Sequence, residues 1–234
     1  MSFEKLDQTP ATYDNLFVSG GDRGVFDLHY RNSCYFPMFQ QVERILRRHG
    51  CRSVLEVGCG TGAFAHLLLD KGRYHYRGFD FSSEAVKRAR IRTGEPNLFF
   101  QADAADPNSY SGSQSYDAIV CTEVLEHVPD DIAVISQWPA GSRIIATVPS
   151  FDSAYHLRYF TRVAQVENRY GGSIAIDNIS RIKKPFLVDI SLRNRLREIR
   201  WARYRPALLK KLLGLGRWED VGYWFVIDGL VPDL

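Results

Sequence analysis

The sequence lacks a strong excess of charge of either sign. It contains 30 Lys and Arg residues against 27 Asp and Glu residues, which gives a formal net charge of +3. A dedicated nucleic-acid-binding protein usually carries a larger positive excess, so the overall charge argues against that class. Residues 193–211 nevertheless concentrate cations that could meet RNA, phosphate or anionic lipid. A solvated helix face, on which Arg stems cover apolar surface, explains the same segment without a ligand.

Cysteine is scarce, and long apolar runs are missing. The four cysteines do not have the paired spacing of a metal site, and we expect them to be reduced thiols. Residues 1–14 contain no apolar core of a secretory signal, and no segment approaches about 18 uninterrupted apolar residues. These absences predict a cytoplasmic protein that has no membrane span.

Internal repeats and low-complexity segments are also absent, so the organisation of the chain is inferred from its hydrophobic periods. Short apolar and β-branched runs predict strands at residues 53–58, 74–79, 97–101, 116–121, 142–148 and 222–228. Apolar residues at helical spacing predict helices at residues 35–49, 62–72, 82–92 and 130–137. This alternation predicts an α/β fold, a doubly wound and mainly parallel sheet with helices on both faces.

Three closely spaced glycines follow the first expected strand. Gly58, Gly60 and Gly62 lie in LEVGCGTGAF, directly before a helix, where glycine lets the backbone turn tightly and approach a ligand closely. Asp80 ends the second strand, where its carboxylate can accept the two vicinal hydroxyls of an adenosine ribose. With Ala63 as the third position, the loop also matches the relaxed dinucleotide fingerprint, so a nicotinamide enzyme is an alternative.

Two further segments separate these interpretations. QADAADP follows the third strand, and YDAIVCTEVLEHVPD contains the fourth. Over roughly Ser53–Pro149 the sequence resembles the class I S-adenosylmethionine-dependent methyltransferase family. One departure is QWPAGSRII, which shortens the usual link into the fifth strand. The resemblance implies a seven-stranded sheet and S-adenosylmethionine as the cofactor.

The resemblance also implies a role for each cofactor residue. The glycine loop would face the amino-acid end of the cofactor, Asp80 would hold the ribose, and Asp103 would reach the adenine amine. Phe81 would pack on the adenine face, and Ala104 would lie along it. The expected cofactor contacts are Glu56, Gly58, Cys59, Gly60, Gly62, Asp80, Phe81, Asp103, Ala104 and Thr122.

The residues just after the fourth strand are candidates for catalysis. On a helix, Glu123, Glu126 and His127 would share a face. With His156 they offer oxygen and nitrogen donors that could hold a divalent metal ion. The spacing resembles the ExxEH pattern of the ubiquinone-pathway O-methyltransferases and of the small-RNA terminal 2′-O-methyltransferases, some of which use such a metal. Alternatively, the catalytic residues are His127 or His156 as a general base, with Glu123 beside it, or the histidines are structural.

The flanking segments are expected to complete the site. We expect residues 1–50 to form a helical lid, 51–150 a cofactor-binding core and 151–234 a substrate-side region with a helical insertion before the last strand, all in one domain. Tyr13, Tyr30 and Arg31 would close over the site, and Arg158 would favour an anionic acceptor.

The leading hypothesis is methylation of a small-molecule acceptor on oxygen, because aromatic pocket candidates outnumber basic ones near the expected site. An RNA methyltransferase, acting on a 2′-oxygen or a base, is the second hypothesis, and steep salt dependence of RNA binding would indicate it. A non-catalytic cofactor-binding protein is the third. The sequence leaves the oligomeric state open.

Overall fold

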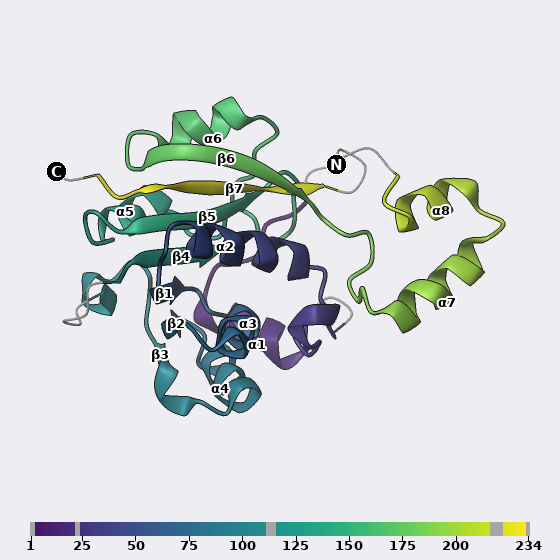
Figure 1. Cartoon of the computed structure of the whole chain (residues 1–234), viewed down its shortest axis with the longest axis horizontal. Helices are drawn as coiled ribbons and strands as arrows, with labels where there is room; N and C mark the ends of the chain where they lie inside the picture. Colours follow the sequence, from purple (N-terminus) through teal and green to yellow (C-terminus); the bar gives the residue numbers. More distant parts are fainter. Residues whose placement is uncertain (1–2, 22–23, 111–115, 216–221, 233–234) are drawn as a thin grey trace.

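A seven-stranded sheet forms the centre of the chain (Figure 1). The computed structural model describes residues 3–21, 24–110, 116–215 and 222–232. The strand order is β3-β2-β1-β4-β5-β7-β6, in which β1 to β5 run parallel and β7 runs antiparallel to both of its neighbours. The strands are β1 Ser53–Val57, β2 His75–Asp80, β3 Phe99–Gln101, β4 Ala118–Thr122, β5 Arg143–Pro149, β6 Ala175–Lys183 and β7 Tyr223–Leu230. The predicted α/β fold with a mainly parallel sheet is confirmed.

Helices cover both faces of the sheet. Residues of α2, α3 and α4 belong to one hydrophobic core, and residues of α5 and α6 belong to a second core on the opposite face. The α-helices are α1 Pro10–Val18, α2 Phe36–Arg48, α3 Ala63–Lys71, α4 Ser83–Thr93, α5 Asp131–Ser136, α6 Val163–Tyr170, α7 Leu192–Ala202 and α8 Pro206–Leu212. Short 3₁₀ turns are η2 Tyr30–Asn32, η3 Pro96–Leu98 and η4 Pro107–Tyr110. Among the described residues, no helix is both long and apolar enough to cross a membrane.

Local sequence explains why these elements form where they do. In α2 the apolar residues Phe39, Val42 and Leu46 recur at helical spacing and are buried against the sheet. Full burial of such a side chain contributes roughly 1.5–3 kcal/mol. The hydroxyl of Ser82 begins α4 by accepting a hydrogen bond from the amide of Ala85 at 3.1 Å. These signals account for the close match between the predicted and observed boundaries.

The region after β5 contains a strand that the sequence did not reveal. We expected a long helical stretch there, but residues 175–183 form β6 at the edge of the sheet. β6 is only half-buried, and polar residues interrupt its isoleucines, so its period of two is weak. A register shift between Ile176 and Asn178 weakens the pattern further. Two helices, α7 and α8, lie between β6 and β7 and extend away from the sheet (Figure 1).

Candidate functional site

A cavity of about 520 Å³ lies at the carboxyl ends of the parallel strands. Glu56 of β1, Asp80 of β2 and Thr122 of β4 all line it. Ligands of open parallel sheets bind at this edge, where the strand order reverses direction. Here β1 lies between β2 and β4, so the cavity occupies the expected switch point. The fold thus brings the ends of three strands to one site.

The glycine loop between β1 and α3 forms one wall of the cavity. Gly58, Gly60 and Gly62 have φ values of 71°, 50° and 73°, which L side chains rarely adopt. A methyl group on Gly58 would lie 2.2 Å from Cγ2 of Val124, so this position also tolerates no side chain. Gly62, in contrast, does not line the cavity, and a methyl group added to it would lie 3.0 Å from Ala89 of α4. The loop needs its glycines both for ligand approach and for helix packing.

Asp80 is held by the glycine loop itself. One carboxylate oxygen accepts a hydrogen bond from the amide of Gly60 at 2.9 Å, and the other accepts from the amide of Ser82 at 2.9 Å. Burial raises the pKa of this carboxyl group to about 6, although the two amide hydrogen bonds oppose the shift. Each oxygen keeps a lone pair that can accept a further hydrogen bond from a ligand hydroxyl.

The other predicted cofactor residues also line the cavity, namely Glu56, Cys59, Phe81, Asp103, Ala104 and Thr122. Glu56 accepts a hydrogen bond from the Tyr76 hydroxyl at 2.5 Å, and burial raises its pKa to about 8. Asp103 is exposed and uses one oxygen to accept from the amide of Ala105 at 2.9 Å. Its second oxygen therefore remains available at the cavity. The structure brings all of these residues together.

The N-terminal helix α1 covers the cavity from outside the sheet. Tyr13 of α1 lines the cavity and meets Phe81 edge to face at 5.0 Å and His127 at 5.8 Å between ring centres. Its hydroxyl donates to the side-chain oxygen of Gln8 at 2.7 Å. Phe17, one helical turn later, packs on Phe26 with ring centres 4.9 Å apart. The roof of the cavity is therefore aromatic.

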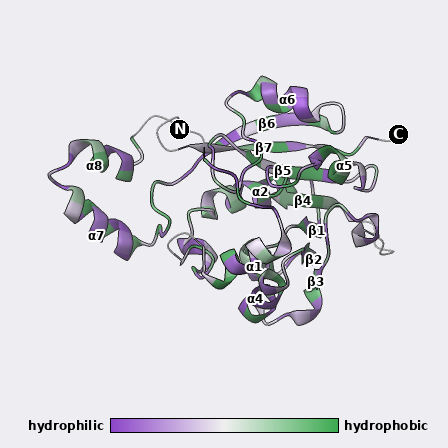
Figure 2. Cartoon of the chain, turned by 180° about the vertical axis from the view of Figure 1, so that it is seen from behind, coloured by the Kyte–Doolittle hydropathy of each residue, from purple (hydrophilic) through white to green (hydrophobic). Residues whose placement is uncertain are grey.

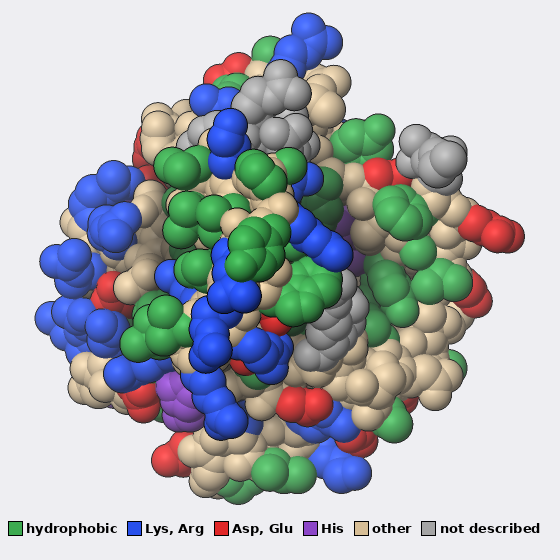
Figure 3. Space-filling model, turned by 90° about the vertical axis from the view of Figure 1, so that its right-hand side faces the viewer, with side chains coloured by type: hydrophobic (Ala, Val, Ile, Leu, Met, Phe, Trp, Pro, Cys, Tyr) green, Lys and Arg blue, Asp and Glu red, His purple; other side chains and the backbone are tan. Residues whose placement is uncertain are grey.

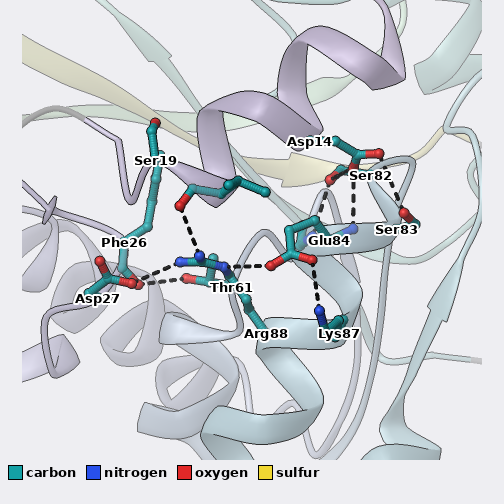
Figure 4. A network of polar contacts seen from close by, with 12 residues as sticks. Asp14, Ser19, Phe26, Asp27, Thr61, Ser82, Ser83, Glu84, Lys87 and Arg88 are labelled. Carbon is teal, nitrogen blue, oxygen red and sulfur yellow. Dashed lines mark hydrogen bonds and ion pairs between the residues drawn. The ribbon is translucent and has the colours of Figure 1, made fainter.

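Polar contacts attach this roof to α4 (Figure 4). Asp14 accepts hydrogen bonds from the hydroxyl of Ser82 at 2.5 Å and from the amide of Glu84 at 3.2 Å. Arg88 bridges Glu84 and Asp27 at 3.0 and 2.8 Å. The amides at the start of α4 attract the Asp14 carboxylate, as the N-terminus of a helix does. The N-terminal segment is thus fixed beside Asp80.

The EVLEH segment is not helical, which corrects the expectation that its side chains share a helix face. Residues 123–127 form a turn, and Glu123 has a left-handed φ of 57°. The amide of Glu123 donates to Oγ1 of Thr147 at 3.0 Å, and this contact fixes the turn against β5. The helix starts only at α5, after the cap at Asp130. The positions of these side chains are therefore set by the turn and not by one face of a helix.

The turn still gathers three of the four predicted metal ligands, and Glu123 is not part of the group. Ligand-type atoms of Glu126, His127 and His156 all lie within 4.8 Å of one another. Nδ1 of His127 lies 2.7 Å from the carbonyl oxygen of Tyr155, and Nδ1 of His156 lies 3.0 Å from that of Phe151. A carbonyl accepts only, so each Nδ1 carries the proton and each neutral ring keeps its lone pair on Nε2. Burial lowers the pKa of both imidazoles to about 4, which leaves them neutral near pH 7.

Two carboxyl groups and one lysine lie in this region, and of these Glu123 and Lys184 line the cavity whereas Glu126 is buried behind it. Burial raises the pKa of Glu123 and Glu126, and the nearby charge of Glu123 raises that of Glu126 further. Neither side-chain oxygen of Glu126 has a hydrogen-bond partner among the described residues. Lys184 follows β6, and its ammonium lies 4.2 Å from the ring centre of Phe151. This region therefore contains two neutral imidazoles that can accept protons, the buried carboxyl groups and the ammonium of Lys184.

Three predicted substrate residues lie outside the lining of the cavity. The hydroxyl of Tyr30 donates to Asp70 at 2.5 Å, and Arg31 pairs with the same carboxylate at 3.4 Å. Arg158 donates to the backbone carbonyl of Pro129 at 2.9 Å and forms an ion pair with Asp131 at 3.3 Å. The guanidinium groups of Arg31 and Arg158 thus join segments of the fold and do not face the cavity. Of the four predicted substrate residues, Tyr13 alone lines the cavity.

Other lining residues had not been anticipated, among them Ser33, Phe39, Phe151, Tyr155 and Lys184. They come from segments that tertiary contacts bring to the cavity. The amide of Cys34 donates to the carbonyl of Val188 at 2.8 Å, which places Ser33 near the chain that follows Lys184. No local motif marks such a pairing. In the sequence these positions appear only as scattered aromatic residues and a lysine, a pattern too common to indicate a ligand site.

The comparisons with known proteins agree with this geometry. Residues 28–163 match the methyltransferase domain family, more than half of the chain. The chain belongs to this family. The matched range contains the glycine loop, Asp80, Asp103 and both candidate histidines. It ends before β6, α7 and α8, which lie outside the shared part of the sequence.

Curated relatives resemble part of the chain. The ubiquinone biosynthesis O-methyltransferase of Serratia proteamaculans is 33% identical over 100 residues, which cover 41% of each chain. That of Vibrio vulnificus is 36% identical over 87 residues, or 36% of each chain. The chain thus matches about two fifths of the length of these relatives.

Solved structures share the fold over nearly the whole chain. The N-methyltransferase NodS of Bradyrhizobium japonicum, which was crystallised with S-adenosyl-L-homocysteine, has a TM-score of 0.57 at 16% identity and covers 86% of this chain and 89% of its own. The [4+2]-cyclase SpnF has a TM-score of 0.60 at 15% identity, with 99% of both chains covered. Likeness at these identities shows the fold alone, and one fold supports different reactions.

Proposed function

We propose that the protein transfers a methyl group from S-adenosylmethionine to an oxygen of a small-molecule acceptor. The observation that carries this proposal is the continuous cavity of about 520 Å³ at the carboxyl ends of the strands. It joins the glycine loop and Asp80 to an aromatic space beside His127 and His156. Its size suits a nucleoside cofactor together with a small acceptor. The O-methyltransferases of ubiquinone biosynthesis, as curated relatives, favour oxygen as the methylated atom.

The cofactor would bind along the strand ends. The backbone of Gly58 and Gly60 would approach its amino-acid end, and Asp80 would accept hydrogen bonds from the two ribose hydroxyls. Phe81 would lie against the adenine, and the free oxygen of Asp103 would accept from the adenine amine. S-adenosylmethionine would supply the electrophilic methyl carbon. The protein's contribution is mainly to position this carbon in line with the acceptor and to exclude water.

A histidine would take the proton of the acceptor hydroxyl. His127 and His156 present unprotonated Nε2 atoms because their Nδ1 atoms bind backbone carbonyls. Nε2 of His127 lies 3.9 Å from a carboxyl oxygen of Glu126, whose raised pKa leaves it an uncharged neighbour of the base. The low pKa of each ring keeps it in the basic form at neutral pH, although it weakens the base. Proton removal would accompany methyl transfer.

The same donors fit a divalent cation. Glu126, His127 and His156 would hold it, and the unpartnered oxygens of Glu126 would gain a charge to bind. Hydrogen bonds from Nδ1 to backbone carbonyls are also the usual support of a metal-bound histidine. When bound, such an ion would lower the pKa of an acceptor hydroxyl. Activity in EDTA, before and after readdition of Mg²⁺, Mn²⁺ or Zn²⁺, separates the metal from the general base.

The N-terminal segment would act as a lid. Tyr13 contacts both Phe81 and His127, and Phe17 lines the same cavity, so a bulky cofactor would enter by displacing this aromatic cover. The α7 and α8 pair would be the substrate-side insertion. Closure of α1 over bound ligands would exclude water from the reacting atoms.

Calorimetry followed by a turnover assay tests the proposal. S-adenosylmethionine and S-adenosylhomocysteine should both bind, and Asp80→Asn should weaken both by about tenfold or more because charge-assisted hydrogen bonds are lost. A panel of phenols and carboxylic acids should then yield S-adenosylhomocysteine with at least one member. His127→Asn should lower kcat about 10²-fold or more while leaving cofactor affinity unchanged. Failure of well-folded protein to bind either nucleoside would refute the proposal.

A further inference from the structure

The helices α7 and α8 form a protruding arm, defined as residues Leu192–Leu215. They pack against each other, and no other described element packs extensively on either. Figure 1 shows the arm extending from the side of the sheet, far from α5 and α6. An isolated helical pair of this length gains little stability from its own core. The arm therefore exposes most of its surface for contacts outside the fold.

The charge of the arm is opposite to that of the remaining chain. It contains eight Lys and Arg residues and one Glu, which gives seven net positive charges. The whole chain carries +3, so the residues outside the arm carry a net −4. Arg193, Arg195 and Arg200 have no acidic partner among the described residues. The positive charge is thus concentrated in the arm, which would attract a partner of negative charge.

Large apolar side chains are exposed on the same arm. Leu192 and Leu215 are 73% and 72% exposed, and Trp201 and Tyr204 are 63% and 80% exposed. Figure 2 shows hydrophobic and hydrophilic residues on both helices, and Figure 3 shows hydrophobic side chains beside Lys and Arg on this face. Exposed large apolar residues elsewhere in the described chain are more scattered. The arm therefore combines a cationic surface with apolar side chains that lack a partner within the fold.

The cations lie directly against the exposed aromatic rings. The guanidinium carbon of Arg205 lies 4.3 Å from the ring centre of Trp201, and that of Arg203 lies 4.6 Å from the ring centre of Tyr204. At a membrane surface, Trp and Tyr lie at the level of the headgroups, and nearby Arg side chains reach the phosphates. The two pairs in the arm supply both components side by side.

We infer that the arm is a docking site for a bilayer that contains anionic phospholipid. The cations would bind the headgroups, and the exposed leucines and Trp201 would enter the boundary between headgroups and acyl chains. The aliphatic side chains decide between a bilayer and RNA. Nucleic acid offers phosphates and stackable bases, which leave Leu192, Leu196 and Leu215 exposed to water, whereas a bilayer removes them from water.

The arm begins beside the cavity. The amide of Ile190 donates to the carbonyl of Asn32 at 2.7 Å, and that of Cys34 donates to Val188 at 2.8 Å. Ser33, between Asn32 and Cys34, and Lys184, four residues before Val188, line the cavity. Docking would therefore place this side of the cavity near the bilayer. The inference itself does not depend on methyl transfer, because it rests on the surface of the arm alone.

Vesicle sedimentation with the full chain tests the inference. Vesicles of phosphatidylcholine with about one third phosphatidylglycerol should bind the protein at least tenfold more tightly than vesicles of phosphatidylcholine alone. Arg195→Gln/Arg200→Gln should weaken this binding roughly 25-fold, because each cation at an anionic surface contributes about a fivefold factor. Leu192→Ser/Leu196→Ser should weaken it at least tenfold with no change of charge. The fluorescence of Trp201 should shift to shorter wavelength on binding, a change that Trp201→Phe removes.

Matched changes on the body of the protein provide the controls. Ile91→Ser on α4, where Ile91 is 74% exposed, and Arg47→Gln/Arg52→Gln should leave vesicle binding unchanged. Circular dichroism should show that all variants melt as the wild type does. Absence of vesicle binding, or leucine variants that bind as the wild type does, would overturn the inference. Binding of single-stranded RNA by a protein that ignores vesicles would likewise overturn it and assign the arm to nucleic acid.

Discussion

At the scale of single residues, the cofactor side of the cavity depends on backbone positions that admit few alternatives. Gly60 donates its amide to Asp80, so the loop conformation and the carboxylate position are one unit. The raised pKa of Asp80, about 6, reflects the burial that this unit imposes. A change in the glycine loop should therefore affect both folding and ligand binding.

Gly58→Ala tests this coupling. Its φ of 71° and the 2.2 Å approach of a Cβ to Val124 should together lower the free energy of unfolding by about 2–4 kcal/mol and abolish cofactor binding. Gly72→Ala is the matched control, because its φ of 64° is similar but nothing lies within 4 Å of the added methyl. It should cost only about 1 kcal/mol and leave binding intact. Urea denaturation and calorimetry measure both quantities, and equal effects at the two glycines would contradict the argument.

At the scale of elements, the roof helix α1 is held by contacts to the start of α4. Asp14 accepts hydrogen bonds from the hydroxyl of Ser82 and the amide of Glu84. Both donors follow Asp80 closely in the chain. Asp14→Ala should weaken binding of S-adenosylhomocysteine about three- to tenfold, because the aromatic cover loses its anchor. Asn15→Ala, an exposed neighbour, should have no effect. Calorimetry checks both variants, and equal binding by Asp14→Ala and wild type would show that α1 does not contribute to the site.

Elements with strong local signals were predicted well, and those defined by tertiary contacts were not. Buried parallel strands such as β1 and β4 are continuous apolar runs, and α4 has a serine cap and an acidic first turn. The edge strand β6 is half polar, so its pattern did not separate it from a helix. The EVLEH segment has a helical pattern of letters, but the left-handed Glu123 turns the chain instead.

The same distinction divides the candidate site. Strand ends meet at one edge by topology, so Glu56, Asp80 and Asp103 were placed correctly in the cavity from their order in the chain. His156 was grouped with His127 from chemistry alone, and the structure brings them to ring centres 5.1 Å apart. Lys184 follows an unrecognised strand and was missed, whereas Arg31 and Arg158 were expected in the cavity and instead bind carboxylates and backbone.

At the scale of the whole molecule, burial of neutral histidines should control stability in acid. His127 and His156 have a pKa of about 4 in the folded chain and about 6.5 when exposed in the unfolded chain. Between these values the unfolded state binds more protons, so stability is present above pH 6.5 and is lost as pH falls toward 4. Each histidine should account for a loss of up to about 3 kcal/mol.

Buried carboxyl groups change the stability in the opposite direction as the pH falls. The histidine contribution must therefore be measured by comparing the wild type with a variant that lacks both histidines. Glu56 and Glu126 have raised pKa values, so in the folded state they bind protons more readily and favour folding as pH falls. The wild-type curve of stability against pH therefore contains both effects. His127→Gln/His156→Gln removes only the histidine contribution, so wild type should lose stability relative to this variant between pH 6.5 and 4. His75→Gln, at an exposed position, is the control. If the curves of stability against pH run parallel for the wild type and the double variant, the two imidazoles are protonated as readily in the folded chain as in the unfolded one, and the prediction is wrong.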